Sequence, residues 1–463
     1  MDHKDFYVFG ERVRASVPRG VDTEVLADFW NGFCARVGVL ETELGKDLQI
    51  CIGNATLLPL GENDDYTLCI STDGIGIKGR DAAGLVRGFS ALLLQIRACE
   101  DRSGEFVVPV CEKHGAFTAG VRMIHLCVFP ETTLPMLHKL VRLCAVLSYT
   151  HVIIEFWGML RYDCLPALSW EHAYTKDEIR PILREARALG VEPIPMFNHL
   201  GHASGCRIDI GKHVVLDQNP TLQSLFTPDG WCWSVNSSAA KELLRKIRQE
   251  LCELFGAGSY FHVGCDEAHI YSSEYYPLSD LCSYLGELTA EVIADGRRPI
   301  LWGDMIVPLN TNSDKEEQRA AARLAEEKMR PLLRALHPES VIADWHYDTT
   351  VAPIRSSLIF KEAGFDVIGC PWDNRKNVDA HYETLTKNRT FGLMMTTWHT
   401  LPSGISAILY FARKCGLAKT DWSDHTGHRN LEIATILRKV TPASTTYQNY
   451  GFCPRQIKDT IDW

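Results

Sequence analysis

"YFHVGCDEAHIY" occupies residues 260–271 and joins a short apolar run to two adjacent acids, Asp266 and Glu267. The run 260–265 is apolar at almost every position, which is typical of a strand buried on both faces of a parallel sheet. Two like charges directly after such a strand have a simple structural explanation, because acids favour the first turn of a following helix. They also have a chemical explanation, which depends on the fold around them.

Seven further runs of the same kind follow one another along the chain, with amphipathic segments between them. The runs are 119–126, 151–156, 191–197, 299–304, 341–345, 366–372 and 392–398. One intervening helix is well marked, since Thr175 and Glu178 form a capping-box pattern and Gly190 follows the last turn. Eight strand–helix units in about 300 residues predict an α/β fold of the (β/α)8 TIM-barrel type.

The segment before residue 116 has a different pattern. Strand-like alternation broken by Asp-Gly turns, followed by a helical stretch at 81–98, predicts a small α+β domain. We therefore predict an N-terminal α+β domain at 1–115, a catalytic barrel at 116–420, and a C-terminal tail at 421–463 that packs on the barrel.

Composition narrows the function classes. The chain has 463 residues, a formal charge of -10 and 46% hydrophobic residues, which is ordinary for a folded soluble protein. The mild acidity without a basic block argues against nucleic-acid and membrane partners. No run reaches a membrane span, the first residues do not resemble a secretory signal, and the 16 cysteines lie mostly in apolar runs. These features predict a cytoplasmic protein with reduced thiols.

In a barrel of this type the active site lies at the carboxyl ends of the strands. The residues near the predicted strand ends are Arg122, His125, Glu155, Trp157, Asn198, His199, His202, Asp266, Glu267, Trp302, Asp304, Trp345, Tyr347, Asp348, Trp372, Asp373, Trp398 and His399. Each of the last four strands contributes a tryptophan. Flat apolar walls with a few acids among them suit a sugar ring, although large aromatic residues also simply fill barrel tops.

The spacing of the two acids restricts the mechanism. Ordinary glycosidases place two carboxyl groups on opposite sides of the anomeric carbon, whereas Asp266 and Glu267 leave the backbone from one place. They act from one side if the nucleophile belongs to the substrate, as the carbonyl oxygen of a 2-acetamido group does. One acid then orients the acetamido group, and the other protonates the leaving oxygen and later activates water.

The motif His262-Val263-Gly264-Cys265-Asp266-Glu267 resembles the His-x-Gly-Gly-Asp-Glu signature of the family 20 glycoside hydrolases, the β-N-acetylhexosaminidases. The stretches 173–203 and 65–95 also resemble that family, the first through its Gly-His-Ala and the second as the small domain ahead of the barrel. The resemblance implies a retaining exo-β-N-acetylhexosaminidase that removes terminal β-linked GlcNAc or GalNAc through an oxazolinium intermediate. The family uses no metal and no organic cofactor.

The resemblance also implies roles for individual residues. Asp266 would position the acetamido group, Glu267 would be the acid/base, and Arg122 would grip the sugar hydroxyls. The remaining substrate-binding candidates are His202, His262, Trp302, Trp345, Tyr347, Trp372, Asp373, Trp398 and His399. Tyr347 is the candidate for holding the acetamido oxygen, because strand seven ends in Trp372-Asp373 where the family has Tyr-x-Asp.

Several positions depart from the family pattern. Met196, Asn198 and His125 replace acids, and Thr400 replaces the glutamate that reads distal hydroxyls. The catalytic pair is kept while this hydroxyl-reading shell is changed. The departures leave GlcNAc, GalNAc and a substituted sugar open, and the lost charge at Thr400 predicts tolerance of a 6-sulfated sugar.

Two other function classes remain. A metal-dependent hydrolase could use His199, His202 and Cys206, with Asp266 nearby. A carbohydrate-binding barrel without catalysis would keep the aromatic pocket but would not need an acid beside the leaving oxygen. Turnover of a nitrophenyl β-GlcNAc separates the second class from an enzyme.

Overall fold

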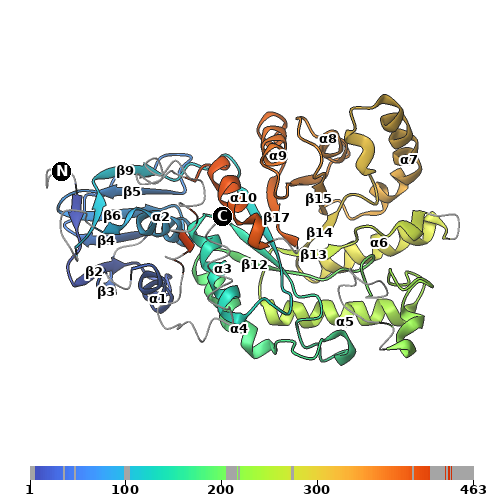
Figure 1. Cartoon of the computed structure of the whole chain (residues 1–463), viewed down its shortest axis with the longest axis horizontal. Helices are drawn as coiled ribbons and strands as arrows, with labels where there is room; N and C mark the ends of the chain where they lie inside the picture. The colour runs from blue at the N-terminus through green and yellow to red at the C-terminus, as the bar shows by residue number, and fades with distance from the viewer. Residues whose placement is uncertain are drawn as a thin grey trace.

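The structure is a computed structural model (Figure 1). It describes residues 6–34, 37–45, 48–98, 105–204, 216, 219–272, 276–398 and 401–417, and the single positions 433, 436, 437 and 440. Almost all of the predicted tail at 421–463 and the substrate-binding candidate His399 therefore lie outside the described residues.

The N-terminal part forms two small sheets. A mixed six-stranded sheet has the order β3-β2-β4-β6-β5-β9, and a three-stranded sheet has the order β1-β8-β7. The strands are β1 (Phe6–Val8), β2 (Arg12–Val17), β3 (Val39–Leu44), β4 (Gln49–Gly53), β5 (Tyr66–Ile70), β6 (Gly74–Gly79), β7 (Arg97–Ala98), β8 (Phe106–Pro109) and β9 (Cys111–His114). Helices α1 (Thr23–Cys34) and α2 (Ala82–Gln95) accompany them, so the predicted α+β character is confirmed.

Eight parallel strands close into the barrel, in sequence order around it. They are β10 (Val121–Cys127), β11 (His151–Glu155), β12 (Glu192–Met196), β13 (Tyr260–Gly264), β14 (Arg298–Trp302), β15 (Val341–Trp345), β16 (Asp366–Cys370) and β17 (Gly392–Thr396). Each falls within one or two residues of a predicted run, which confirms the (β/α)8 fold.

Helices form the outer layer of the barrel (Figure 1). They are α3 (Leu134–Val146), α4 (Lys176–Ala188), α5 (Ser238–Phe255), α6 (Leu278–Ala294), α7 (Glu316–Ala335), α8 (Arg355–Glu362), α9 (Arg375–Asn388) and α10 (Leu401–Lys414). Within the described residues, four 3-10 turns lie in the connections: η2 (Pro166–Leu168), η3 (Pro220–Leu225), η4 (His269–Ser272) and η5 (Leu309–Asn312). The capping box at the start of α4 is present, with Thr175 and Glu178 each bonded to the backbone of the other.

The strands are apolar at successive positions because both of their faces are buried. On β11, Ile153 packs inside the barrel together with Met123, whereas Val152 and Ile154 pack on the face that meets the helices. A strand with only one buried face would alternate apolar and polar residues. The barrel interior is therefore a packed core at mid-height, and ligand chemistry is confined to its carboxyl end.

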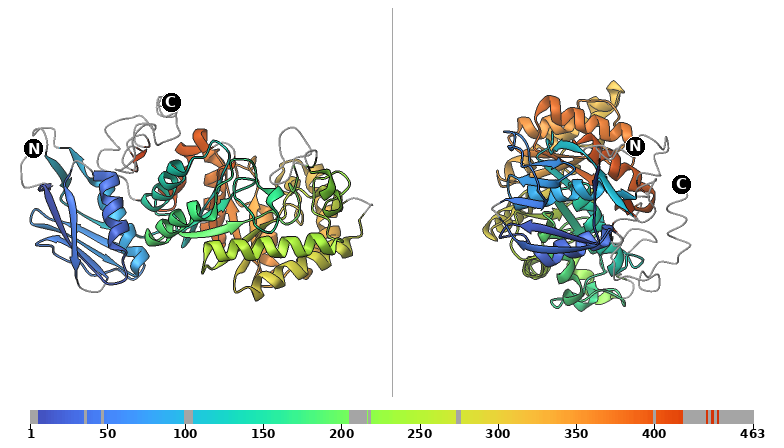
Figure 2. Two further views of the ribbon diagram at one scale, coloured as in Figure 1. Left: turned by 90° about the horizontal axis from the view of Figure 1, so that it is seen from below. Right: turned by 90° about the vertical axis from the view of Figure 1, so that its left-hand side faces the viewer.

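The N-terminal sheets lie beside the barrel, and α2 faces its helix α3 (Figure 2). Helix α2 is buried over residues 84–95, since it lies between its own sheet and the barrel. The domain boundaries at 115/116 and 420/421 remain predictions. Among the described residues, none of the helices combines the length and apolarity that crossing a bilayer requires.

Candidate active site

The two acids follow β13 at the carboxyl end of the barrel. The next α-helix, α6, begins only at Leu278, so the acids do not lie in the first turn of an α-helix. The backbone at the turn is unusual, because Gly264, Cys265 and Glu267 have φ values of 68°, 74° and 50°. A Cβ on Gly264 would lie 2.4 Å from Oδ1 of Asn198, so this position needs glycine for space as well as for conformation.

Asn198, which comes just after β12, holds both the turn and the first acid. Its Nδ2 donates to Oδ1 of Asp266 at 2.6 Å, and its Oδ1 accepts from the backbone N–H of Cys265 at 2.8 Å. Asp266 is only 4% exposed. The Asp266 carboxylate is therefore held in one orientation by Asn198, which is itself bonded to the backbone of the turn.

His202 joins the two acids. Its Nε2 lies 3.4 Å from Oδ2 of Asp266 and 3.0 Å from Oε2 of Glu267. Glu267 is the more open of the two, with 39% of its side chain exposed. Its backbone carbonyl accepts from the indole Nε1 of Trp231 at 3.0 Å, and the Trp231 ring lies 4.4 Å from the His202 ring. A buried acid and an accessible acid thus share one imidazole, an arrangement that gives the two carboxyl groups different environments.

A third acid, Asp304, follows β14 and lies against this pair. Its Oδ2 accepts from the backbone N–H of Glu267 at 2.9 Å, and its Oδ1 accepts from Nε1 of Trp345 at 3.2 Å. Burial, together with the charge of Asp266, raises the pKa of Asp304 to about 8. Asp304 therefore binds a proton more tightly than an ordinary aspartate does, and it braces the backbone of Glu267.

Aromatic side chains form one wall around the acids. Trp302 and Trp398 lie 5.5 Å apart, and Tyr347 lies 5.1 Å from each of Trp345 and Trp372. The wall is internally bonded, because Nε1 of Trp398 donates to the Tyr347 hydroxyl at 2.8 Å. Burial raises the pKa of Tyr347 well above its usual value, so its hydroxyl stays protonated.

The other predicted site residues have mixed positions. His262 is fully buried inside the barrel, where its ring lies 4.6 Å from that of Trp302 and its Nδ1 accepts from the backbone of Gly264. Asp373 is exposed, directly after Trp372. The structure thus brings together His202, His262, Trp302, Trp345, Tyr347, Trp372 and Trp398 around or beneath Asp266 and Glu267.

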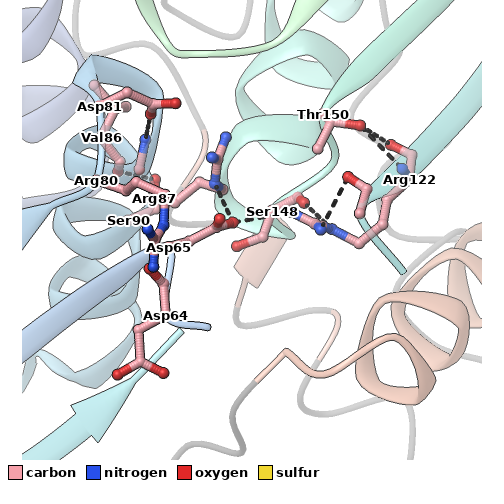
Figure 3. Close-up of polar contacts among 12 residues, drawn as sticks. Asp64, Asp65, Arg80, Asp81, Val86, Arg87, Ser90, Arg122, Ser148 and Thr150 are labelled. Atoms are coloured by element: carbon pink, nitrogen blue, oxygen red, sulfur yellow. Dashed lines mark hydrogen bonds and ion pairs between the residues drawn. The ribbon is translucent and has the colours of Figure 1, made fainter. Parts of the chain in front are cut away.

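The position of Arg122 differs from the one predicted from the sequence. It is the second residue of β10, at the amino end of the barrel, and about five residues of strand, or roughly 16 Å, separate it from the carboxyl end. Its Nε donates to the carbonyl of Ser148 at 2.8 Å, and its Nη2 lies 3.6 Å from Oδ2 of Asp65 in the N-terminal part (Figure 3). The prediction that Arg122 binds the sugar hydroxyls is therefore wrong, because the side chain serves the contact between the barrel and the N-terminal sheets.

The metal site considered from the sequence is not assembled either. His199 packs between Phe197 and Phe261, with ring distances of 5.8 and 5.7 Å, and its Nδ1 bonds to the carbonyl of Phe197. His202 faces the acids instead. Among the described residues, the one group of three or more potential ligands within metal-binding reach is His125, Cys127 and Glu155, while Cys206 lies outside the described part of the chain.

Three residues of the site had no role assigned from the sequence. Asn198 and Asp304 stand at predicted strand ends, so their positions were visible, but their bonds to Asp266 and Glu267 were not. Trp231 was missed altogether, because it comes from the long connection between β12 and α5. The two tryptophans Trp231 and Trp233, close together in this connection, are the signal that could have drawn attention to it.

Comparisons with known proteins agree with the fold. Residues 155–329 match the model of the glycosyl hydrolase family 20 catalytic domain. A family 20 exo-β-N-acetylglucosaminidase from Vibrio harveyi, in complex with N-acetylglucosamine, superposes with a TM-score of 0.64 at 15% identity over 96% of this chain and 75% of that one.

Two Streptomyces structures are similar over most of both chains. The family 20 β-N-acetylhexosaminidase from Streptomyces coelicolor A3(2) gives a TM-score of 0.65 at 15% identity, over 97% of this chain and 94% of that chain. A mutant Streptomyces plicatus β-hexosaminidase in complex with the product GlcNAc gives 0.65 at 15% identity, over 98% and 94%. The chain therefore shares the fold of these enzymes, and its residues 155–329 carry the match to the family 20 catalytic domain.

Proposed function

We propose that this protein is a retaining exo-β-N-acetylhexosaminidase that uses the 2-acetamido group of its substrate as the nucleophile. The observation that carries the proposal is the contact of Asp266 and Glu267 with one nitrogen of His202, at 3.4 and 3.0 Å. Two carboxylates that share one imidazole nitrogen lie on the same side of any sugar bound between them and the aromatic wall. They cannot flank the anomeric carbon from opposite faces.

The accessible acid is placed for proton transfer. Glu267 gives its proton to the leaving glycosidic oxygen as the acetamido carbonyl oxygen attacks C1 and the C1–O bond breaks. Water then attacks C1 of the oxazolinium intermediate and gives its proton to Glu267, which restores the acid. The bond between C1 and the acetamido oxygen breaks in this step, which regenerates the 2-acetamido group. Two displacements at C1 return the original β configuration.

The buried acid is placed for charge stabilisation. Asp266 is held by Asn198, so its carboxylate does not reorganise when the acetamido group becomes cationic. A covalent glycosyl intermediate on Asp304 is disfavoured, because both of its oxygens already accept hydrogen bonds, from Glu267 and from Trp345. Trp302, Trp345 and Trp398 supply apolar faces for the acetamido methyl group and the sugar ring.

The identity of the sugar is a narrower proposal. Terminal β-linked GlcNAc or GalNAc fits the one-sided acid pair equally well, since both carry the 2-acetamido group. The tolerance of a 6-sulfated sugar depends on His399 and Thr400, which lie outside the described residues. It remains a prediction.

A panel of nitrophenyl glycosides tests the function directly. We expect turnover of the β-GlcNAc or β-GalNAc substrate and essentially none of the β-glucoside, which lacks the nucleophile. A thiazoline analogue of the oxazolinium should bind much more tightly than GlcNAc. Tight sugar binding without any turnover would instead indicate a carbohydrate-binding barrel, and a trapped covalent glycosyl-enzyme would exclude the substrate-assisted route.

We also propose a reducing, cytoplasmic compartment for the protein. The 12 cysteines for which the structure gives a state are buried or partly buried thiols. Fractionation of the native source with a thiol-labelling assay tests this proposal, and recovery of the protein from a secreted fraction would contradict it.

A further inference from the structure

A second group of reactive side chains lies inside the barrel, where the proposed reaction does not use it. His125 and Cys127 are on β10, and Glu155 is the last residue of β11. The register of these parallel neighbours pairs Cys127 with Glu155 and His125 with Ile153. Positions 123, 125 and 127 share one face of β10, and Met123 and Ile153 belong to the interior core, so all three side chains point into the barrel.

The three groups lie close together and are sealed from solvent. Nε2 of His125 is 3.1 Å from Oε2 of Glu155, and Sγ of Cys127 is 3.6 Å from that oxygen and 3.7 Å from Nε2. Their exposed fractions are 0%, 4% and 0% for His125, Cys127 and Glu155. The cluster is thus set by three adjacent strand positions rather than by flexible loops.

These separations match those of a tetrahedral metal ion. With zinc bonds of about 2.0 Å to nitrogen and oxygen and about 2.3 Å to sulfur, ligand atoms at tetrahedral angles lie about 3.3–3.6 Å apart. The observed triangle differs from this by a few tenths of an ångström. An imidazole, a thiolate and a carboxylate form a donor set that suits zinc better than magnesium or calcium, which prefer oxygen ligands.

The surroundings also favour a bound cation. The His125 ring lies against the rings of Trp398 and Trp302, at 4.8 and 6.0 Å. Burial of a carboxylate and a thiol side by side in such an apolar environment is costly unless their charge is matched. A divalent cation would match it with three ligands from the chain and leave a fourth position for water.

We propose that His125, Cys127 and Glu155 bind one zinc ion inside the carboxyl end of the barrel. The site is separate from the His202–Asp266–Glu267 group and does not depend on the proposed glycosidase activity. Its position beside Trp302 and Trp398 places the ion behind the aromatic wall.

The test measures zinc bound to the full-length protein. The protein is stripped with a chelating resin under a non-thiol reductant, reloaded with zinc, desalted and analysed by mass spectrometry for metal per chain. We expect one equivalent in the wild type and at least a tenfold weaker affinity in Cys127→Ser and Glu155→Gln. Cys370→Ser is the matched control, because Cys370 is also a buried last residue of a barrel strand but donates to the carbonyl of Ile368. Cys370→Ser should still bind one equivalent of zinc.

Cobalt provides a second readout on the wild-type protein, independent of how well the variants fold. Cobalt bound at this site should give intense tetrahedral d–d bands and a thiolate-to-cobalt charge-transfer band. Cys127→Ser should lose the charge-transfer band, and Cys370→Ser should keep it. The proposal is overturned if stripped wild-type protein takes up no zinc, if cobalt gives no thiolate band, or if zinc uptake is equal in the wild type and in Cys127→Ser.

Discussion

At the amino end of the barrel, the buried Arg122 donates through its Nε and Nη1 to the carbonyls of Ser148 and Ala119, and it shares Asp65 with the buried Arg87. At the carboxyl end, Asp266, Glu267 and Asp304 crowd around one another and share partners. Burial lowers the pKa of Arg122 to about 10, which leaves it charged at neutral pH, whereas burial and a neighbouring acid move the pKa of Asp304 to about 8. A buried charge bonded to backbone carbonyls supports the fold, while crowded like charge marks the place where protons move.

Backbone strain separates the two ends in the same way. Four non-glycine residues with φ between 46° and 74°, namely His202, Cys265, Glu267 and Trp398, lie at or just after strand ends around the site. At the amino end, Ser148 has a positive φ, whereas Arg122 and the other residues that it contacts do not. Strain of this kind persists where the surrounding structure fixes it and is concentrated at functional sites.

The largest expected effect is on kcat and comes from changing the two acids at the carboxyl end of the barrel. Glu267→Gln should lower kcat by about 10²–10⁴-fold, because it removes the acid/base while keeping the bonds of the Glu267 backbone. The loss should be smaller for substrates with a good leaving group, which need little protonation. Asp266→Asn should reduce kcat more than it raises KM, since its charge matters most in the cationic intermediate.

The control for these variants is Glu171→Gln, an exposed glutamate in the connection after β11. It should leave kcat and KM unchanged. Equal losses for Glu267→Gln across good and poor leaving groups, measured with a series of nitrophenyl and alkyl glycosides, would remove Glu267 from the proton-transfer step.

The next prediction compares the stability of two glycine variants, one at a closely packed position and one at an open position. Gly264 and Gly256 both have φ of 68°, but a Cβ on Gly264 would meet Asn198, and one on Gly256 would meet nothing within 4 Å. Gly256→Ala should cost about 1–3 kcal/mol of unfolding free energy for the conformation alone, because its φ of 68° with ψ of -155° is a region that glycine alone adopts readily. Gly264→Ala should cost about 1–3 kcal/mol more and should also lower kcat, because the displaced Asn198 holds Asp266. Denaturant unfolding of both variants decides this, and equal costs would show that Asn198 moves freely.

Arg122→Lys should damage the fold and spare the chemistry. Lysine cannot place donors on both the Ser148 and Ala119 carbonyls, so we expect a loss of about 1–3 kcal/mol in stability with near-normal kcat and KM. Arg298→Lys is the control, because Arg298 stands at the start of β14 but its ion pair with Asp366 is partly exposed. It should cost less. Lost turnover at unchanged melting temperature would return Arg122 to the active site.

The error over Arg122 shows what the sequence could and could not predict. Apolar runs and intervening helices predicted all eight barrel strands, because burial on both faces leaves a pattern in each strand separately. The motif at 262–267 predicted where Asp266 and Glu267 lie, because residues that directly follow a barrel strand lie at its carboxyl end. An arginine within a predicted strand could belong to either end, and the pattern of that strand alone does not say which.

Contacts between distant segments were the other limit. His202 and Asp266 are brought together by adjacent strands, which the barrel order implies, but Trp231 reaches Glu267 from a connection with no periodic pattern. The bonds of Asn198 and Asp304 depend on side-chain geometry at the turn after Gly264. Residues of these kinds are found only when the backbone of the turn is known.

The smallest expected effect concerns the proton on Asp304. An aspartate with a pKa of about 3.9 in the unfolded chain and about 8 in the folded protein binds more proton in the native state between these values. Its stabilising contribution is therefore complete below about pH 4 and is lost as pH rises through about 8. Between pH 5 and 8 wild-type stability should fall by at most the ~1.4 kcal/mol per pH unit that one whole proton gives. Asp304→Asn has no proton to lose, so its melting temperature should depend less on pH in this window. Asparagine keeps one acceptor oxygen, so either the Trp345 indole or the Glu267 backbone N–H loses its acceptor at every pH, which lowers the whole curve without changing its slope. Melting curves for both proteins at several pH values measure the two slopes, and parallel curves would show that Asp304 is already ionised beside Glu267.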